Sequence, residues 1–133
     1  MELTKQQIEE MFHSALCNGL GYLGGYGLQL DYYPEKYNEA KQKLDDPCYE
    51  DVLMQMLKDG EKLYIIDTEF YHEPDGYEKE FEGYDSEISL NDVYERLPYT
   101  PKYHLEAMLE GHDDAETADA ILQTVFYMDI IFG

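Results

Sequence analysis

The sequence predicts a single α+β domain, in which about six helices pack with a small antiparallel hairpin or sheet. Helix-start and helix-stop signals recur along the chain, two stretches have the character of strands, and neither an internal repeat nor a long linker divides it. The length of 133 residues suits one domain, 1–133, and a hydrophobic content of 44% is sufficient for a buried core.

The first expected helix begins after Thr4 and ends at Asn18-Gly19. Thr4 is a favourable N-cap residue, and Gln7 follows three positions later, where it completes a capping box. Because Asn and Gly are common at helix C-termini, we place the end of this helix at Asn18-Gly19. The apolar residues of its buried face are Ile8, Met11, Phe12, Ala15 and Leu16.

A short strand and two helices are expected next. Residues 28–32 alternate apolar and polar side chains, as a half-buried strand does. Pro34 suits the first turn of a second helix, and Asp46-Pro47 has the same character at the start of a third. The third helix is expected to end at Gly60.

Residues 62–71 and 77–88 are expected to pair as a β-hairpin. The segment between them, 73–76, has the sequence Glu-Pro-Asp-Gly, which is typical of turns. The second arm consists mostly of acidic residues. We therefore expect it at an edge of the sheet, where charge discourages pairing with other chains.

Three further helices are expected in the last third of the chain. Ser89 begins the first with a second capping box, Pro101 lies at the start of the next, and Asp113 opens the last. The apolar tail, 130–132, is expected to pack against the domain. The expected core face of the last helix is Ala118, Ile121, Leu122, Val125 and Phe126.

Three stretches of the chain are similar to a known family. They are GYLGGYG at 21–27, residues 47–60, and DDAETADAILQTVFYMDIIFG at 113–133. On these stretches the sequence resembles a family of small acidic uncharacterised proteins from gut bacteria, whose members look like cargo of mobile elements. The resemblance covers most of the chain and implies no activity, cofactor or site residue.

Acidity is the strongest functional signal in the sequence. The chain has 30 acidic and 9 basic residues, which give a formal net charge of -21. Such a charge repels phosphate backbones and anionic lipid, so we expect no direct binding to nucleic acid and none to a membrane surface. It attracts basic proteins instead and speeds encounter with them. No signal peptide is evident at the start of the sequence, which favours a cytoplasmic location.

The acidic residues concentrate between positions 67 and 95, and this segment is the predicted partner-binding surface. Glu78, Glu80 and Glu82 alternate along the expected second arm, so they would share one face at a spacing of about 6.6 Å. Such a row would imitate a phosphate backbone and occupy the basic groove of a DNA-binding protein. A solvated edge strand protected by charge is the other interpretation of the same row. The predicted partner-binding residues are Asp67, Glu69, Glu78, Glu80, Glu82, Tyr84, Asp85 and Glu87.

Two alternative functions would use residues 11–30, a segment without charged side chains. Residues 19–24 match G-x-G-x-x-G, but a helix rather than a strand precedes them, so we expect a loop or a tight helix-to-strand connection and not a dinucleotide site. A small-molecule-binding or enzymatic domain would use residues 19–27, with Tyr22 and Tyr26 lining a pocket. A homo-oligomeric structural module would assemble through residues 11–30 and the apolar C-terminus.

The two cysteines, Cys17 and Cys48, are too few for a disulfide scaffold. Each has apolar neighbours in an expected helix, so we expect both to be buried, reduced thiols. His13 lies one helical turn before Cys17, as a base lies near a nucleophile, but no third group that would orient the histidine is evident. We therefore predict no catalytic residue, no metal ligand and no cofactor.

Overall fold

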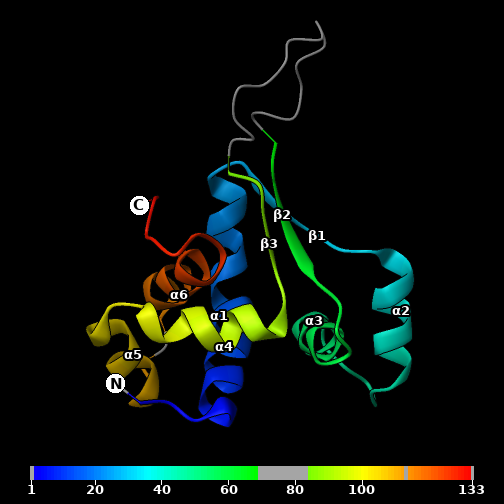
Figure 1. The fold of residues 1–133 in the computed structure, drawn as a ribbon, viewed down its shortest axis with the longest axis horizontal. Coiled ribbons are helices and arrows are strands. Elements are labelled where there is room, and N and C mark those ends of the chain that lie inside the picture. Colours follow the sequence, from blue (N-terminus) through cyan, green and yellow to red (C-terminus); the bar gives the residue numbers. More distant parts are fainter. Residues whose placement is uncertain (1, 69–83, 113, 133) are drawn as a thin grey trace, which may run out of the picture.

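The computed structural model describes residues 2–68, 84–112 and 114–132. Within these residues the predicted α+β class is confirmed, with helices that dominate a small antiparallel sheet (Figure 1). The elements are, in chain order, α1 Lys5–Gly25, β1 Leu28–Asp31, α2 Pro34–Gln42, α3 Tyr49–Lys58, β2 Leu63–Asp67, β3 Ser86–Ile88, α4 Leu90–Arg96, the 3-10 helix η1 Leu97–Tyr99, α5 Lys102–Leu109 and α6 Ala115–Tyr127.

The three strands form one antiparallel sheet in the order β1-β2-β3. The predicted pairing of the two hairpin arms is confirmed for their described parts, β2 and β3, and β3, which ends the second arm, is an edge strand as expected. The strand predicted at 28–32 is β1, which forms the other edge. The whole predicted row of Glu78, Glu80 and Glu82 lies outside the described residues, as does Glu69 of the predicted partner-binding residues.

Helices α1, α4 and α6 pack against the sheet, and α6 lies beside α1 (Figure 1). Phe12 of α1, Leu53 of α3 and Ile121 of α6 are fully buried in one cluster with Leu63 and Ile65 of β2. All five residues predicted for the core face of the last helix are buried. Among the described residues, we find no helix whose length and apolarity would let it span a membrane.

Helix α1 is longer than predicted, because it continues through Asn18-Gly19 to Gly25. Its predicted capping box is confirmed: Thr4 Oγ1 accepts from the Gln7 backbone N–H at 3.1 Å. Gly19 does not end the helix, because it lies where α1 crosses α6. A Cβ atom on Gly19 would approach Leu122 Cδ1 at 2.9 Å and the carbonyl carbon of Ala118 at 3.0 Å. Here glycine allows two helices to come close, which a local sequence signal cannot show.

A tight connection joins α1 to the sheet at residues 26–27, whereas residues 19–24, which the sequence predicted to form a loop or such a connection, lie within the helix. Only two residues separate the end of α1 at Gly25 from β1. The second of them, Gly27, has a φ of 81°, a conformation that favours glycine. The G-x-G-x-x-G match therefore lies inside the last turns of a helix. A dinucleotide fingerprint requires the reverse order, a strand that leads into a helix N-terminus.

Two helix starts differ from the predictions by one or two residues. Helix α3 begins at Tyr49 with Cys48 as its N-cap, rather than at Pro47. Asp46 has a φ of 49°, so the chain still turns there and the helix can begin only afterwards. Helix α6 has Asp114 as its N-cap, with the carboxylate accepting from the Thr117 backbone N–H at 2.8 Å.

The C-terminal tail packs mainly through its backbone and Phe132. The side-chain oxygen of Gln123, which is fully buried, accepts from the backbone N–H groups of Ile131 at 2.7 Å and Phe132 at 2.8 Å. The Phe132 ring stacks on Tyr26 with centroids 4.7 Å apart. The predicted packing is thus confirmed for Phe132, while the side chains of Ile130 and Ile131 stay 39% exposed.

Candidate functional site

The face of the sheet that points away from the core carries exposed carboxylates near the predicted partner-binding residues. We call it the outer sheet face, and its residues are Gln29, Asp31, Tyr64, Ile66 and Glu87. The strand register sets Asp31 opposite Tyr64, and Tyr64 opposite Glu87, so a carboxylate, a ring and a second carboxylate form one row across three strands. Directly opposite residues have Cβ atoms about 4.5–5.5 Å apart. The two carboxylates of the row are exposed and the ring between them is half-buried.

A hollow of about 440 Å³ opens over this face. Asp31, Asp85 and Glu87 contribute carboxylates to its lining, and Tyr33 and Tyr64 contribute rings. None of the described residues that line it is basic. The two rings meet edge to face at 5.9 Å, and burial together with the neighbouring Tyr33 raises the pKa of Tyr64, so its hydroxyl stays protonated at neutral pH.

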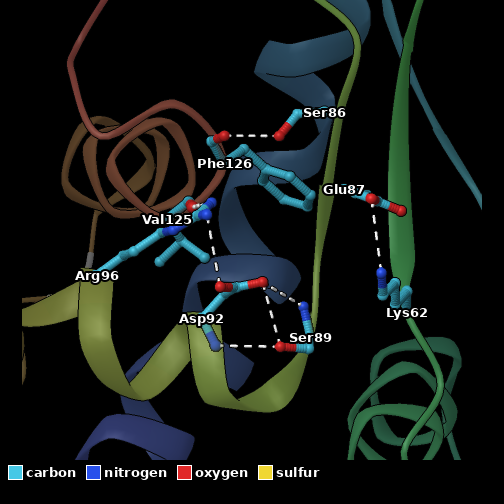
Figure 2. Close-up of polar contacts among 8 residues, drawn as sticks. All are labelled: Lys62, Ser86, Glu87, Ser89, Asp92, Arg96, Val125 and Phe126. Carbon is cyan, nitrogen blue, oxygen red and sulfur yellow. Dashed lines mark hydrogen bonds and ion pairs between the residues drawn. The ribbon is translucent and has the colours of Figure 1, made fainter.

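This lining suits recognition of a cation rather than catalysis. A guanidinium or ammonium group that enters the hollow meets carboxylates that can accept charge-assisted hydrogen bonds. The faces of the tyrosine rings attract the same cation through their quadrupoles. Lys62, which precedes β2, forms an ion pair with Glu87 at 3.5 Å (Figure 2). The Glu87 carboxylate is therefore accessible to a basic side chain.

Asp67 differs from its predicted role, because its side chain is buried and is only 3% exposed. Its carboxylate accepts from the Tyr84 backbone N–H at 3.0 Å, and the Asp85 carboxylate accepts from the Asp67 backbone N–H at 2.7 Å. The two aspartates thus bind β2 to the segment before β3. Asp67 stabilises the sheet and does not present its charge to a partner, whereas Asp85 remains exposed at the rim of the hollow.

The edge strand β3 is firmly attached to α6. Ser86 Oγ donates to the Phe126 carbonyl oxygen at 2.6 Å, and Arg96 of α4 donates to the Val125 carbonyl oxygen at 3.1 Å (Figure 2). The hydroxyl of Tyr127 donates to the Tyr84 carbonyl oxygen at 2.7 Å. The bonds at Tyr84 and Ser86 hold the chain on both sides of Asp85 and just before Glu87, so these carboxylates project from an anchored segment.

Tyr84 itself is 38% exposed, and its ring lies 4.9 Å from that of Phe132. It therefore covers the C-terminal tail and leaves only part of its surface for a partner. Its ring is mainly a packing element, in contact with the rings of Tyr127 and Phe132.

The predicted pocket at Tyr22 and Tyr26 lies at the end of α1. The Tyr26 hydroxyl donates to Asp119 Oδ2 at 2.8 Å, and burial, reinforced by Asp119, raises the pKa of Tyr26 to about 12. Tyr22 is 43% exposed. Among the described residues, neither tyrosine lines the hollow over the outer sheet face or the two hollows beside α1. Tyr26 is thus engaged in a buried polar network rather than aimed into open space.

The cysteines differ from the prediction, because both Cys17 and Cys48 are exposed, although both are free thiols as expected. His13 Nδ1 lies 3.9 Å from Cys17 Sγ, and a third group does exist: Asp51 Oδ1 lies 2.8 Å from His13 Nε2. Sequence reasoning missed Asp51 because it is 38 positions away from His13. One signal in the sequence could have found it. Two pairs of residues able to ligate a metal stand three or four positions apart, His13 with Cys17 and Cys48 with Asp51.

These three groups have the order of a nucleophile, a base and an orienting acid, but the thiol is not activated. Partial burial and the nearby Glu50 carboxylate raise the pKa of Cys17 to about 11. A reactive cysteine needs the opposite shift, because the thiolate is the nucleophile. The arrangement therefore argues against nucleophilic catalysis by Cys17.

Comparison with known proteins adds no relative to these observations. No protein-family model, no curated protein and no solved structure matches the chain.

Proposed function

We propose that the protein is a non-enzymatic binding protein whose acidic surface engages a basic partner. The observation that carries this proposal is the row formed by Asp31, Tyr64 and Glu87 on the outer sheet face, beneath a hollow without basic lining residues. An arginine or lysine of the partner would lie over the ring and between the two carboxylates. The net charge of -21 supports the same direction of attraction.

The chemistry predicts how such binding behaves. Opposite charge accelerates encounter, and salt screens it, because the Debye length falls from about 10 Å at 0.1 M to about 3 Å at 1 M ionic strength. The tyrosine rings contribute contact area that salt affects less. Binding should therefore weaken with salt but leave a residual affinity that depends on the rings.

In its sharpest form, the protein is a nucleic-acid mimic that inhibits a DNA- or RNA-handling protein, such as a restriction or other defence nuclease. Glu87 lies on the edge strand, and the predicted row of Glu78, Glu80 and Glu82 precedes it in the same arm of the hairpin. Regularly spaced carboxylates along one edge resemble the spacing of charge along a nucleic-acid strand. This form of the proposal requires a partner with a basic groove.

The first experiment measures the dissociation constant for an arginine-rich peptide at rising salt. The test variant combines Asp31→Asn with Glu87→Gln, and the matched control combines Glu2→Gln with Glu110→Gln, which removes the same charge elsewhere. We expect the test variant to bind about tenfold more weakly, or about 1.4 kcal/mol, and the control to change much less. Binding that ignores salt, or an equal loss in the control, would contradict the proposal.

The second experiment tests the mimic. The activities of a panel of DNA- and RNA-cleaving nucleases are measured with and without the protein. Where the protein inhibits, an excess of duplex DNA that the nuclease cannot cleave is then added as a competitor. A mimic must be displaced by the duplex, because both occupy the same basic groove. Replacement of Glu78, Glu80 and Glu82 by Gln should relieve the inhibition, and inhibition that survives both treatments would rule the mimic out.

A further inference from the structure

Four side chains able to ligate a metal gather where α1 meets the start of α3. His13 and Cys17 lie one turn apart on α1, while Cys48 and Asp51 are the N-cap and third residue of α3. One donor atom from each of His13, Cys48 and Asp51 lies within 4.8 Å of the others. Helix spacing on both elements explains this, because residues one turn apart share a face.

We propose that His13, Cys48 and Asp51 bind a thiophilic divalent transition metal, with Zn²⁺ as the principal candidate. An imidazole nitrogen, a thiolate and a carboxylate oxygen are all ligands that Zn²⁺ accepts. With metal–ligand bonds of about 2.0–2.3 Å, tetrahedral donors lie roughly 3.5 Å apart. Donor atoms within 4.8 Å of one another reach that spacing by small side-chain rotations, which their partial exposure allows. Three protein ligands leave one position open for water or another small ligand.

The carboxylate of this site is already held in place. Asp51 Oδ2 accepts from the Cys48 backbone N–H at 3.1 Å, and Oδ1 of the same carboxylate faces His13 Nε2 at 2.8 Å. A single carboxylate therefore caps α3 and turns its other oxygen toward the histidine. Hydrogen bonds of this kind orient metal ligands in known sites and contribute to their affinity.

Cys17 lies near the other ring nitrogen of His13 and is not one of the three ligands. Its Sγ atom lies 3.9 Å from Nδ1, the ring nitrogen that does not face Asp51. A histidine that ligates through Nε2 is commonly fixed by a partner on Nδ1, and Cys17 occupies that place. Cys17 is thus a positioning residue.

The plain alternative is an ion pair that joins α1 to α3. The side chains of His13 and Asp51 are 36% and 44% exposed, and an exposed pair of this kind contributes about 0–1 kcal/mol. An ion pair, however, makes no use of Cys48. The two interpretations therefore differ in what happens to the sulfur of Cys48 when a metal is added.

The test uses the reduced full-length protein, freed of metal with a chelator. Zn²⁺ affinity is measured by competition with a chromogenic chelator, and Co²⁺ is added as a spectroscopic probe in the presence of excess Mg²⁺, which occupies sites made of carboxylates alone. We expect one Zn²⁺ per chain, together with a thiolate-to-cobalt charge-transfer band. Absence of that band, or of binding with one ion per chain, would overturn the proposal.

Substitutions then assign the ligands, with helix content measured by circular dichroism for each variant. Cys48→Ser should abolish the charge-transfer band and weaken Zn²⁺ binding by more than about tenfold. Loss of a residue that only hydrogen-bonds to a metal ligand already lowers metal affinity about 10–100-fold, and loss of a ligand should cost at least as much. Cys17→Ser should keep the band. His112→Gln, which alters an exposed histidine elsewhere, should change neither property. A band lost in Cys17→Ser but kept in Cys48→Ser would overturn the assignment.

A measurement on the unsubstituted protein guards against variants that fail to fold. The rate of alkylation of each cysteine by iodoacetamide is followed by mass spectrometry with and without Zn²⁺. Zn²⁺ should slow the alkylation of Cys48 much more than that of Cys17, because only a ligating thiolate is withdrawn from reaction. Equal rates with and without Zn²⁺ at Cys48 would leave the ion pair as the whole explanation.

Discussion

The α1–α6 interface and the outer sheet face differ in almost every physical property. At the interface, Gly19 and Ala118 let two helices approach closely, and the hydroxyl of Tyr26, which follows α1, donates to the buried carboxylate of Asp119 on α6. On the outer sheet face, the carboxylates of Asp31 and Glu87 stay exposed. Stability and the proposed binding therefore depend on separate parts of the molecule. Each should therefore respond to a different set of substitutions.

Gln123→Ala should have the largest effect on stability. Gln123 Oε1 accepts from two tail N–H groups, while Nε2 donates to Asp119 Oδ2 at 3.0 Å and to the Phe132 carbonyl oxygen at 3.2 Å. Alanine leaves these groups without their partner and opens a cavity, so we expect a loss of about 3 kcal/mol in the free energy of unfolding. Urea unfolding measures the loss, and amide hydrogen exchange should show that the tail is released.

Gln55→Ala is the matched control for this prediction. The Gln55 amide also donates to a carboxylate, at 2.8 Å from Asp59 Oδ1, but the pair is exposed on α3. Water replaces the lost bond there, so the change should stay within about 0.5 kcal/mol. If both alanine variants lost the same stability, burial of the Gln123 network would not be what matters.

Gly19→Ala and Gly21→Ala should change stability in opposite directions. Both glycines lie in α1, where alanine has the better helix propensity by about 1 kcal/mol. At Gly21 a Cβ atom meets nothing within 4 Å, so the full gain is expected. At Gly19 the new atom collides with Ala118 and Leu122, and overpacking of about 1–3 kcal/mol outweighs the gain. Thermal unfolding of the two variants provides the comparison, and a stabilised Gly19→Ala would show that the helices can separate at little cost.

Tyr26→Phe should cost about 1 kcal/mol, because it removes a hydrogen bond to the buried carboxylate of Asp119. The effect depends on pH with a defined sign. The pKa of Tyr26 is raised from an ordinary value of 10.0 to about 12, so its contribution is fully present below pH 10.0 and is lost as the pH rises toward about 12. The difference between wild type and Tyr26→Phe in urea unfolding should therefore shrink over this range. Tyr22→Phe serves as the control, and a difference that grows with pH would reverse the assignment.

Local signals predicted the elements well, and contacts between distant segments account for the errors. The capping boxes at Thr4 and Ser89 could be read from neighbouring residues, and both are present. Gly19 looked like a helix stop because its true partner, α6, lies about a hundred residues later in the chain. Asp51 could not be connected to His13 for the same reason. Composition alone likewise could not show that Asp67 is buried while Asp85 and Glu87 are exposed.

The smallest effect on stability is expected from the double variant Asp31→Asn, Glu87→Gln. Both carboxylates are exposed, and the only ion pair among the described residues that it removes is the exposed contact between Lys62 and Glu87. Such pairs contribute little, and removal of like charge from a chain of net charge -21 relieves repulsion, so stability should change by less than about 0.5 kcal/mol. The same variant should weaken binding to an arginine-rich peptide about tenfold. Thermal unfolding and a binding isotherm on one protein sample test both halves. A large loss of stability would mean that these carboxylates support the fold, and the separation between the two regions would then fail.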